Sequence, residues 1–554
     1  MKILYNAHIH TNDCLSPKVG AIVIDHGQII HYGDNKELLS KFEDRCPKDD
    51  LFNMRGKTVI PGLIDAHIHL QNYALGLDKV DCETTTKEEC VLRIADRVIE
   101  SPPGQWIQGH GWNHNEWRDG FGTAEDLDRI APENPVFLTA KSLHAAWVNQ
   151  SALVEANIDV HTPDPPDGLL SRDLHGQPTG ILFESAMQLV SVQIPEPSSE
   201  DIVSAIEKAQ PMLWQMGLTG VHDFDRRASF TALQTLHKRG RLGLRVIKSI
   251  PLEDLDHAIG LGLRSGFGDD FLRIGSVKLF ADGALGPRTA AMLQPYDGEP
   301  DNRGMLMLDA EELFEYGRQA VDNGLSLAVH AIGDRAIHEV LNAMAQLRLY
   351  EHERLLLAQT TDQNKDEVYE ESVFNGEWLR HRIEHVQIIH PDDADRLSKL
   401  GVTASMQPIH ATSDMNMADR YWGKRSALAY AWQQQLKSGA VLAFGSDAPV
   451  ESANPFWGIH AAVTRRRRDG TPDEMGWYPE QKIRLSQALE AYTVGAAYAA
   501  GVENKCGKLS PGYLADLVVL DVDPFECSPD NLWNIKPLST MIGGKWVFGM
   551  GSEV

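Results

Sequence analysis

Short apolar runs that end in polar residues recur along most of the chain and alternate with segments of helical character. The runs that we predict as strands are Leu63–His67, Pro135–Ala140, Thr219–Asp223, Ser276–Phe280, Ser326–His330, Arg382–Val386, Val402–Met406 and Val441–Gly445. Eight strands with helices between them favour an α/β fold, a (β/α)8 TIM barrel, whose core takes about 250 residues. The chain has 554 residues, so we expect substantial insertions.

The two ends of the chain carry a different pattern, with short strand-like runs separated by turn residues. Neither end has enough alternating apolar residues to form two packed sheets, whereas the two ends together do. We expect residues 1–60 and 505–554 to form one composite, discontinuous β-sandwich domain. Residues 61–504 should form a TIM-barrel domain, which contains an insertion subdomain at about residues 71–215.

Composition restricts the class of partner. The net charge of −26 argues against a polyanion such as nucleic acid and favours a soluble protein. The expected partner is a small-molecule substrate. The one dense basic run, Arg465–Arg468, is predicted to be a solvated helix face or a salt-bridge patch. Six sparse cysteines favour a reducing compartment, and no apolar run is long enough for a bilayer span, so we expect a cytoplasmic protein without membrane contact. The sequence leaves a homodimer open.

The residues that end the predicted strands suggest one metal site. His67 and His69 follow an apolar run as His-x-His, and alternate residues of a strand share a face. His330, His385 and Asp447 each end a later run, where a barrel places its chemistry. Imidazole and carboxylate groups suit zinc and similar ions, so we predict a divalent metal, zinc by preference, at one or two ions per chain.

Two positions need separate treatment. Lys278 also lies near a strand end, but an ammonium group cannot ligate a cation. It either reacts with carbon dioxide to form a carbamate that bridges two metals, or it is a structural or substrate-binding lysine. A second His-x-His, at His8 and His10, has no partner ligands at barrel spacing, and we expect it not to bind a functional metal.

Five segments together resemble the amidohydrolase superfamily and, more narrowly, its branch related to YtcJ and to N-substituted formamide deformylase. They are Pro61–His69, Val277–Gly286, Val329–Ala336, Arg382–His385 and Phe444–Pro449. The resemblance covers nearly the whole chain. It implies a metal-dependent hydrolase on a TIM barrel, with His67, His69, His330, His385 and Asp447 as metal ligands, and it favours a bridging carbamate on Lys278. Pro287 departs from the small residue expected there, which puts the local loop geometry in doubt.

The expected chemistry is hydrolysis of an amide-type C–N bond, in an N-substituted formamide, an N-acyl compound or a cyclic amide. A metal lowers the pKa of bound water, and Asp447 is the predicted catalytic residue that takes its proton. Candidate substrate-binding residues are His144, Glu184, His222, Asp282 and Arg288. The alternatives are a deaminase or esterase of the same superfamily and, in a different class, an inactive barrel that serves as a scaffold or binding protein. The sequence does not identify the substrate.

Overall fold

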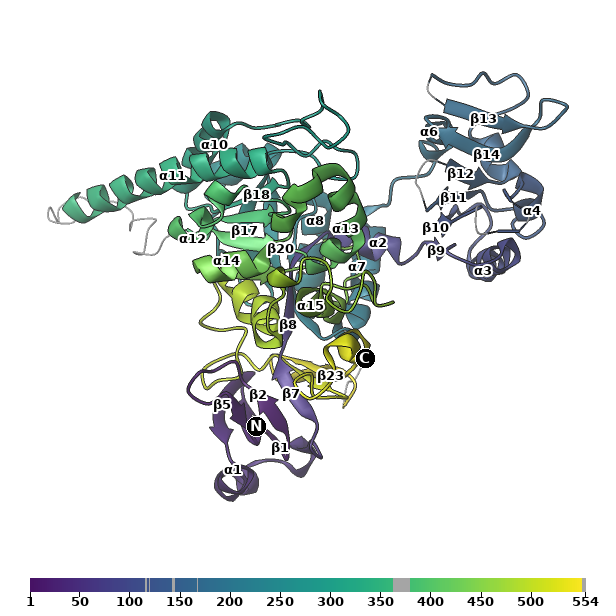
Figure 1. Ribbon diagram of the computed structural model, residues 1–554. Helices are drawn as coiled ribbons and strands as arrows, with labels where there is room; N and C mark the ends of the chain where they lie inside the picture. The colour runs from purple at the N-terminus through teal and green to yellow at the C-terminus, as the bar shows by residue number, and fades with distance from the viewer. Residues whose placement is uncertain (115–116, 119, 142–144, 167, 362–378, 551–554) are drawn as a thin grey trace. The chain divides into compact units, whose positions relative to one another are not determined.

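The computed structural model describes residues 1–114, 117–118, 120–141, 145–166, 168–361 and 379–550 (Figure 1). The chain divides into two compact units, one of Met1–Tyr73 with Ile206–Val554 and the other of Ala74–Ala205. Among the described helices, none combines the length and the apolar character that crossing a bilayer requires.

The larger unit contains a barrel of eight parallel strands that are hydrogen-bonded in chain order. The strands are β8 (Leu63–Ile68), β15 (Leu218–Asp223), β16 (Arg245–Pro251), β17 (Leu272–Phe280), β18 (Leu327–Ala331), β19 (Arg382–His385), β20 (Thr403–Met406) and β21 (Leu442–Phe444). A parallel bridge between Ile68 and Ala448 brings the last strand back to the first. This arrangement, with a helix or helices after each strand, confirms the predicted α/β TIM-barrel fold.

One predicted barrel strand was wrong. Pro135–Ala140 does form a strand, β11 (Val136–Ala140), but β11 belongs to the sheet of the smaller unit. The barrel instead contains β16, whose segment Arg245–Pro251 carries a buried Lys248 that interrupts the apolar pattern. The Lys248 ammonium lies 3.2 Å from the Asp223 carboxylate on the adjacent strand, so an ion pair compensates the buried charge.

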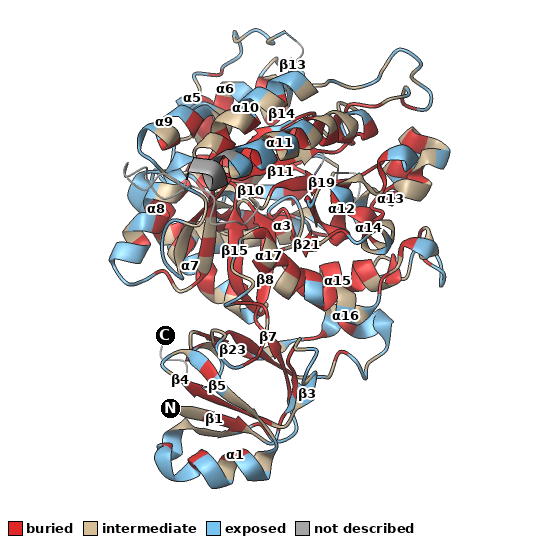
Figure 2. Cartoon of the chain, turned by 90° about the vertical axis from the view of Figure 1, so that its left-hand side faces the viewer, coloured by how far each residue is buried: buried red, intermediate tan, exposed pale blue. Residues whose placement is uncertain are grey.

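Helices surround the barrel, and their sequences explain where they begin and which face they bury. They are α8 (Arg227–Lys238), α9 (Leu255–Gly260), α10 (Ala310–Asp322), α11 (Asp334–Thr361), α12 (Arg396–Lys399), α13 (Pro408–Trp422), α14 (Trp432–Ser438) and α15 (Pro455–Thr464). In α10, Asp309 caps the first turn and forms a capping box with Glu312. Its buried residues, Leu313, Gly317, Ala320 and Val321, recur at helical spacing, so one face packs inward while the other meets solvent (Figure 2).

The two chain ends form two β-sheets within the larger unit. One contains β5 (Gln28–Gly33), β4 (Ala21–Asp25), β1 (Lys2–Tyr5) and β6 (Leu51–Asn53) in that order. The other contains β24 (Lys545–Phe548), β23 (Pro537–Ile542), β22 (Leu517–Leu520), β7 (Thr58–Pro61), β2 (His8–His10) and β3 (Lys18–Val19). Antiparallel pairing of β7 with β22 joins the two ends, and one apolar core takes residues from both sheets. The predicted domain boundaries stay a prediction.

The smaller unit has its own mixed sheet. The strand order is β13 (Gly168–Arg172), β14 (Pro178–Glu184), β12 (Ala145–Val148), β11, β10 (Ile107–Trp112) and β9 (Val80–Asp81). The helices are α3 (Lys87–Glu100), α4 (Ala124–Asp128), α5 (Gln150–Glu155) and α6 (Ala186–Ser191). Trp112, Trp117 and Trp147 are buried in one apolar cluster of this unit. These three tryptophans therefore form part of the core of the unit itself.

The arginine run Arg465–Arg468 is only partly what its charge predicts. Arg465 is fully buried, with its guanidinium over the rings of Trp432 and Trp477 and its N–H groups donating to backbone carbonyls. The expectation of a solvated face was wrong for this residue, because the cation packs on aromatic faces and its donors are satisfied. Arg466 does form a salt bridge, 2.6 Å from Asp530.

Candidate metal centre

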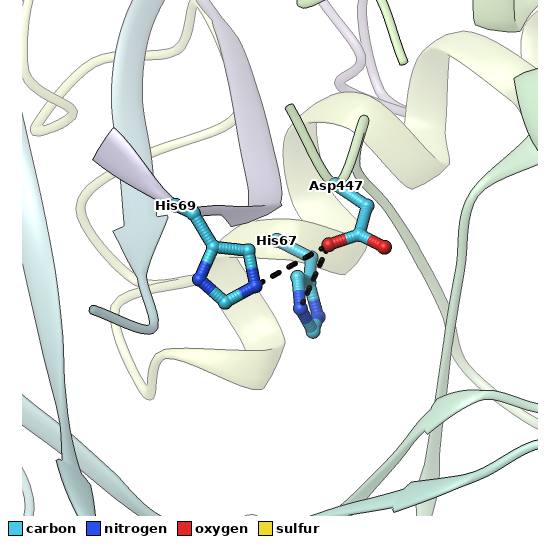
Figure 3. Close-up of side chains that lie close together, drawn as sticks. All are labelled: His67, His69 and Asp447. Carbon is cyan, nitrogen blue, oxygen red and sulfur yellow. Dashed lines mark ion pairs between the residues drawn. The ribbon is translucent and has the colours of Figure 1, made fainter. Parts of the chain in front are cut away.

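His67, His69 and Asp447 come together where the first and last barrel strands meet. Figure 3 shows the two imidazoles facing the Asp447 carboxylate, and one ligand atom from each residue lies within 4.8 Å of the others. Asp447 Oδ1 is 3.5 Å from Nε2 of His67 and 3.5 Å from Nε2 of His69. Among the described residues, no other group of three histidine, cysteine or acidic side chains has this geometry. The arrangement suits a cation held between the three side chains.

The backbone fixes this arrangement. The Asp447 N–H donates to the His67 carbonyl at 2.7 Å, and the His69 N–H donates to the Ala448 carbonyl at 2.9 Å. Below them, the Asp65 carboxylate accepts the N–H groups of both His67 and Ser446, each at 3.0 Å, and the Ser446 hydroxyl at 2.5 Å. Asp65 therefore joins the strand that leads into the histidines to the segment after β21 that contains Asp447.

The remaining predicted ligands lie beside these three. The His385 ring centroid is 4.9 Å from that of His67 and 4.5 Å from that of His330. The amine of Lys278, on the fourth barrel strand, lies between two phenyl rings, 4.7 Å from the Phe224 centroid and 4.9 Å from that of Phe280. Those rings in turn contact the imidazoles of His67 and His330. The structure thus brings all six predicted positions to the same end of the barrel.

Hydrogen bonds decide which ring nitrogen each histidine can present to a cation. Nδ1 of His67 faces Glu384 at 2.6 Å, that of His69 faces Asp225 at 3.2 Å, and that of His385 faces the Gln407 side-chain oxygen at 2.9 Å. Each acceptor holds the proton on Nδ1 and leaves the Nε2 lone pair free. In His330 it is Nε2 that faces an acceptor, the Gly283 carbonyl at 2.9 Å, so Nδ1 is the free nitrogen.

The protonation states match those of metal ligands. Burial lowers the pKa of His67 to about 4 and that of His330 to about 3, and it holds the pKa of His385 well below its ordinary value. Burial alone would raise the pKa of Asp447, but the surrounding histidines, His410 foremost, hold it well below the usual range. Neutral imidazoles beside an ionised carboxylate form a donor set that fits a divalent cation.

His69 and Lys278 differ from this group. Burial lowers the pKa of His69, but the adjacent Asp225 more than offsets it and raises the pKa overall. A cation at Nε2 therefore competes with a proton at this ligand. Burial lowers the pKa of the Lys278 ammonium to about 8, so the neutral amine is accessible near neutral pH.

The candidate substrate residues have diverse surroundings. His144 lies outside the described residues, and Glu184 is exposed at the end of β14 in the smaller unit. His222 is buried, with Nδ1 2.7 Å from an Arg382 nitrogen. The Asp282 carboxylate accepts three backbone N–H groups, from Ala291, Ile332 and Gly333.

The fifth candidate, Arg288, pairs with Glu299 at 2.8 Å and lies over the Tyr421 ring. Protein partners therefore engage His222, Asp282 and Arg288. Substrate binding by all five residues stays a prediction.

Sequence reasoning missed the residues that orient the ligands, namely Asp65, Asp225, Glu384, Gln407 and His410. His410, on α13, places Nε2 3.3 Å from Asp447 Oδ2, opposite the oxygen that faces His67 and His69. A signal existed only for Glu384, because Arg382 and Glu384 put opposite charges at alternate positions of a fully buried strand. Asp65 lies in β8 itself, two residues before His67. Asp225, Gln407 and His410 contact the candidate ligands from elements distant in sequence.

Several known proteins are similar to this chain in sequence or in structure. A family model described as "Amidohydrolase family" matches residues 50–548. YtcJ of Bacillus subtilis (strain 168), named as an amidohydrolase, is 31% identical over 95% of this chain and 96% of its own. Protein LONG AFTER FAR-RED 3 of Arabidopsis thaliana is 32% identical over 99% of this chain and 91% of its own.

A third relative, N-substituted formamide deformylase of Arthrobacter pascens, is 29% identical over 98% of this chain and 97% of its own. Among solved structures, an uncharacterized metal-dependent hydrolase from Pyrococcus furiosus superposes with a TM-score of 0.75. It is 30% identical and covers 95% of this chain and 100% of its own. These matches extend over both the barrel and the segments that flank it.

Proposed function

Since the chain belongs to the amidohydrolase family and is a metal-dependent hydrolase of that superfamily, we propose that it cleaves an amide-type C–N bond of a small molecule. An N-substituted formamide, an N-acyl compound or a cyclic amide is the proposed substrate class. The similarity to a relative named N-substituted formamide deformylase supports this class.

The observation that carries the proposal is the convergence of His67, His69 and Asp447 within 4.8 Å. Nitrogen and carboxylate donors of this kind suit zinc, which is the metal that we propose. When bound, the ion supplies Lewis acidity that lowers the pKa of water and polarises a carbonyl group. The proposed ligands of this centre are His67, His69, His330, His385, Asp447 and a modified Lys278.

Asp447 is the proposed proton acceptor. Its Oδ1 faces the ligand histidines while Oδ2 faces His410, so the carboxylate is held in one orientation. Its low pKa keeps it ionised at neutral pH, and it can take a proton from the attacking water. The same proton can then pass to the leaving nitrogen, which makes the departing amine neutral.

Lys278 is the proposed site of a carbamate. Its neutral amine can attack the carbon of carbon dioxide, and loss of a proton from nitrogen leaves an anionic carboxylate on Nζ. Burial of Lys278 supports this proposal, because it lowers the pKa of the ammonium group to about 8 and so makes the neutral amine accessible. A carboxylate there adds the negative charge that two adjacent cations need.

The test combines metal analysis with a substrate screen. Protein purified without chelator should contain about one to two equivalents of zinc per chain, since the donor set exceeds what one tetrahedral ion requires. The screen covers N-formyl, N-acyl and cyclic amide compounds, with esters and cyclic amines as the competing classes. Less than about a tenth of an equivalent of metal, with activity unchanged by chelation, would contradict the proposed metal chemistry.

A preference for esters or for deamination would redirect the proposal within the superfamily. Metal binding without turnover on any class would favour the non-catalytic barrel. The complete ligand set supports the enzyme over that alternative, because a barrel that had lost its chemistry would have no need of both the histidines and Asp447.

A further inference from the structure

Glu384 forms a buried ion-pair network directly behind the first ligand histidine. One carboxylate oxygen, Oε2, accepts from His67 Nδ1 at 2.6 Å and from the Ser405 hydroxyl at 2.7 Å. Arg382 donates to both oxygens, from Nε to Oε1 at 2.5 Å and from Nη2 to Oε2 at 3.1 Å. The side chains of Glu384 and His67 are 0% and 1% exposed.

The guanidinium of Arg382 is fully engaged on its other sides. Nη1 lies 2.7 Å from His222 Nδ1, and Nη2 donates to the Ala66 carbonyl and the Ser405 hydroxyl, each at 2.6 Å. A buried charge is stable only when its partners are in place, and here every nitrogen of Arg382 has one. The predicted substrate residue His222 thus holds the arginine that holds Glu384.

The other two backing groups differ from Glu384. Gln407, behind His385, is neutral, and Asp225, behind His69, lies 3.2 Å from its ring nitrogen and also accepts from the backbone of Gln71 and Asn72. Of these three acceptors, Glu384 makes the shortest contact with a ring nitrogen, and it is the one clamped by an arginine. A charge-assisted hydrogen bond of this length is among the stronger kinds in proteins.

We propose that Glu384 is a positioning residue that sets the metal affinity of the centre through His67, with Arg382 and His222 holding its carboxylate in place. The negative charge fixes the Nδ1 proton of His67 and makes Nε2 a better electron donor. This inference rests on the metal site of the proposed function. The inference adds that the metal affinity of this site depends on Glu384, a residue that is not itself a proposed ligand.

The chain contains a matched control in a second buried glutamate. Glu351 lies 3.1 Å from His381 Nε2 and 2.6 Å from Arg348 Nη1, and both Glu351 and His381 are fully buried. His381 Nδ1 accepts from the Leu327 N–H, at the beginning of β18, whereas His330 lies near the end of that strand. The control cluster has the same residue types but lies at the opposite end of the strands from the ligands.

The experiment measures zinc affinity of the full-length protein by competition with a chromophoric chelator, for wild type, Glu384→Gln and Glu351→Gln. Loss of the charge behind His67 should weaken zinc binding about 10- to 100-fold, the range seen when such outer partners of metal ligands are replaced. Glu351→Gln should lower thermal stability but leave zinc affinity as in wild type. In cobalt-loaded protein, the visible absorption bands should shift in Glu384→Gln and not in Glu351→Gln.

Glu384→Asp retains a negative charge beside Arg382, but its shorter side chain places that charge farther from His67. It therefore provides the comparison if Glu384→Gln does not fold. It should weaken zinc binding less than the glutamine variant but more than Glu351→Gln. Zinc affinity and cobalt spectra that match those of Glu351→Gln in every Glu384 variant that folds would overturn the inference. A wild-type protein that binds no zinc would instead overturn the proposed function, so the two failures are distinguishable.

Discussion

The chain contains the tripeptide His-Ile-His twice at a strand end, and the two copies have different surroundings. In β2, His8 is exposed, and His10 pairs with Asp523 at 3.1 Å and stacks on Phe525 at 4.4 Å between ring centroids. At the end of β8, His67 and His69 both face Asp447. Each tripeptide forms or ends a strand, so local sequence does not separate them.

The difference lies in what the rest of the chain brings. The barrel adds imidazoles from β18 and β19 and a carboxylate after β21, all at the same end of the sheet. The sheets formed by the chain ends bring one carboxylate and one phenyl ring to His10, so the contacts of His10 are structural. A ligand pair therefore depends on strand topology, since parallel strands repeat the same end around a barrel.

The largest expected effect comes from removing the histidine pair of the barrel, with removal of the pair in β2 as the comparison. The double variant His67→Ala/His69→Ala should lose bound zinc and all measurable turnover, because two donors of the centre disappear. His8→Ala/His10→Ala should keep both properties. Elemental analysis and kcat on an accepted substrate make the comparison. Equal loss of zinc in the two double variants would mean that the barrel site does not have the role assigned to it.

Asp447 faces His67 and His69, whereas no described residue faces both His8 and His10 in this way. Asp447→Asn replaces this carboxylate and leaves all the histidines in place. Asparagine keeps the size and one oxygen donor but cannot accept a proton from water. We expect kcat to fall about a hundredfold to ten-thousandfold, the usual range for general acid–base catalysis. Circular dichroism and zinc content, both near wild type, are the controls. A kcat close to wild type would remove Asp447 from the catalytic role.

Lys278→Ala tests whether the centre includes a ligand besides the histidines and Asp447. If Lys278 carries a bridging carbamate, zinc content and activity should fall together, and a short carboxylic acid added to the solution should restore part of both. The expected loss is at least the roughly 10- to 100-fold seen when outer partners of ligands are removed. Full zinc content with a change confined to KM or kcat would assign Lys278 to substrate binding instead.

The smallest effect concerns the pH dependence of stability at His10. Burial lowers the pKa of His10, although Asp523 opposes the shift. The unfolded chain, with a histidine pKa of about 6.5, therefore binds this proton more readily, and stability falls as pH drops through that value. His10→Gln should make stability fall less steeply between about pH 7 and pH 5.5.

Denaturant unfolding with chelator present measures this slope without a contribution from metal binding. His8→Gln is the matched control, because His8 is exposed in the folded protein. Slopes that are the same in His10→Gln and wild type would show that His10 does not contribute to the acid sensitivity.

The barrel was predictable because most of its strands end in recognisable residues. Seven of the eight predicted segments overlap strands of the barrel sheet. The eighth, Pro135–Ala140, has an equally apolar pattern but pairs with strands of the smaller unit, a choice made by contacts distant in sequence. The strand β16 was missed because Lys248 interrupts its apolar pattern. A segment with a lysine is recognisable as a buried strand only when the partner of that lysine, here Asp223, is known.

The convergence of the candidate ligands at one end of the barrel was predictable for the same reason, whereas the residues that hydrogen-bond to them were not. His330 and His385 occur where a barrel strand ends, so periodicity and spacing indicate them. Asp225 and Gln407 lie after the neighbouring strands and reach the ligands through space. No spacing rule relates a histidine to an acceptor from another element, so only the folded geometry assigns these partners.

The clamp between Asp65 and Ser446 joins residues that are 381 positions apart. During synthesis, the histidines of β8 leave the ribosome long before the strand that carries Asp447 exists. A nascent chain that ends before β21 therefore lacks both the clamp and the acidic ligand. Closing so long a loop is entropically costly, and the gain comes only when the last strand docks. Tight zinc binding should accordingly begin only after the final barrel strand is made, so acquisition of the metal would report completion of the fold.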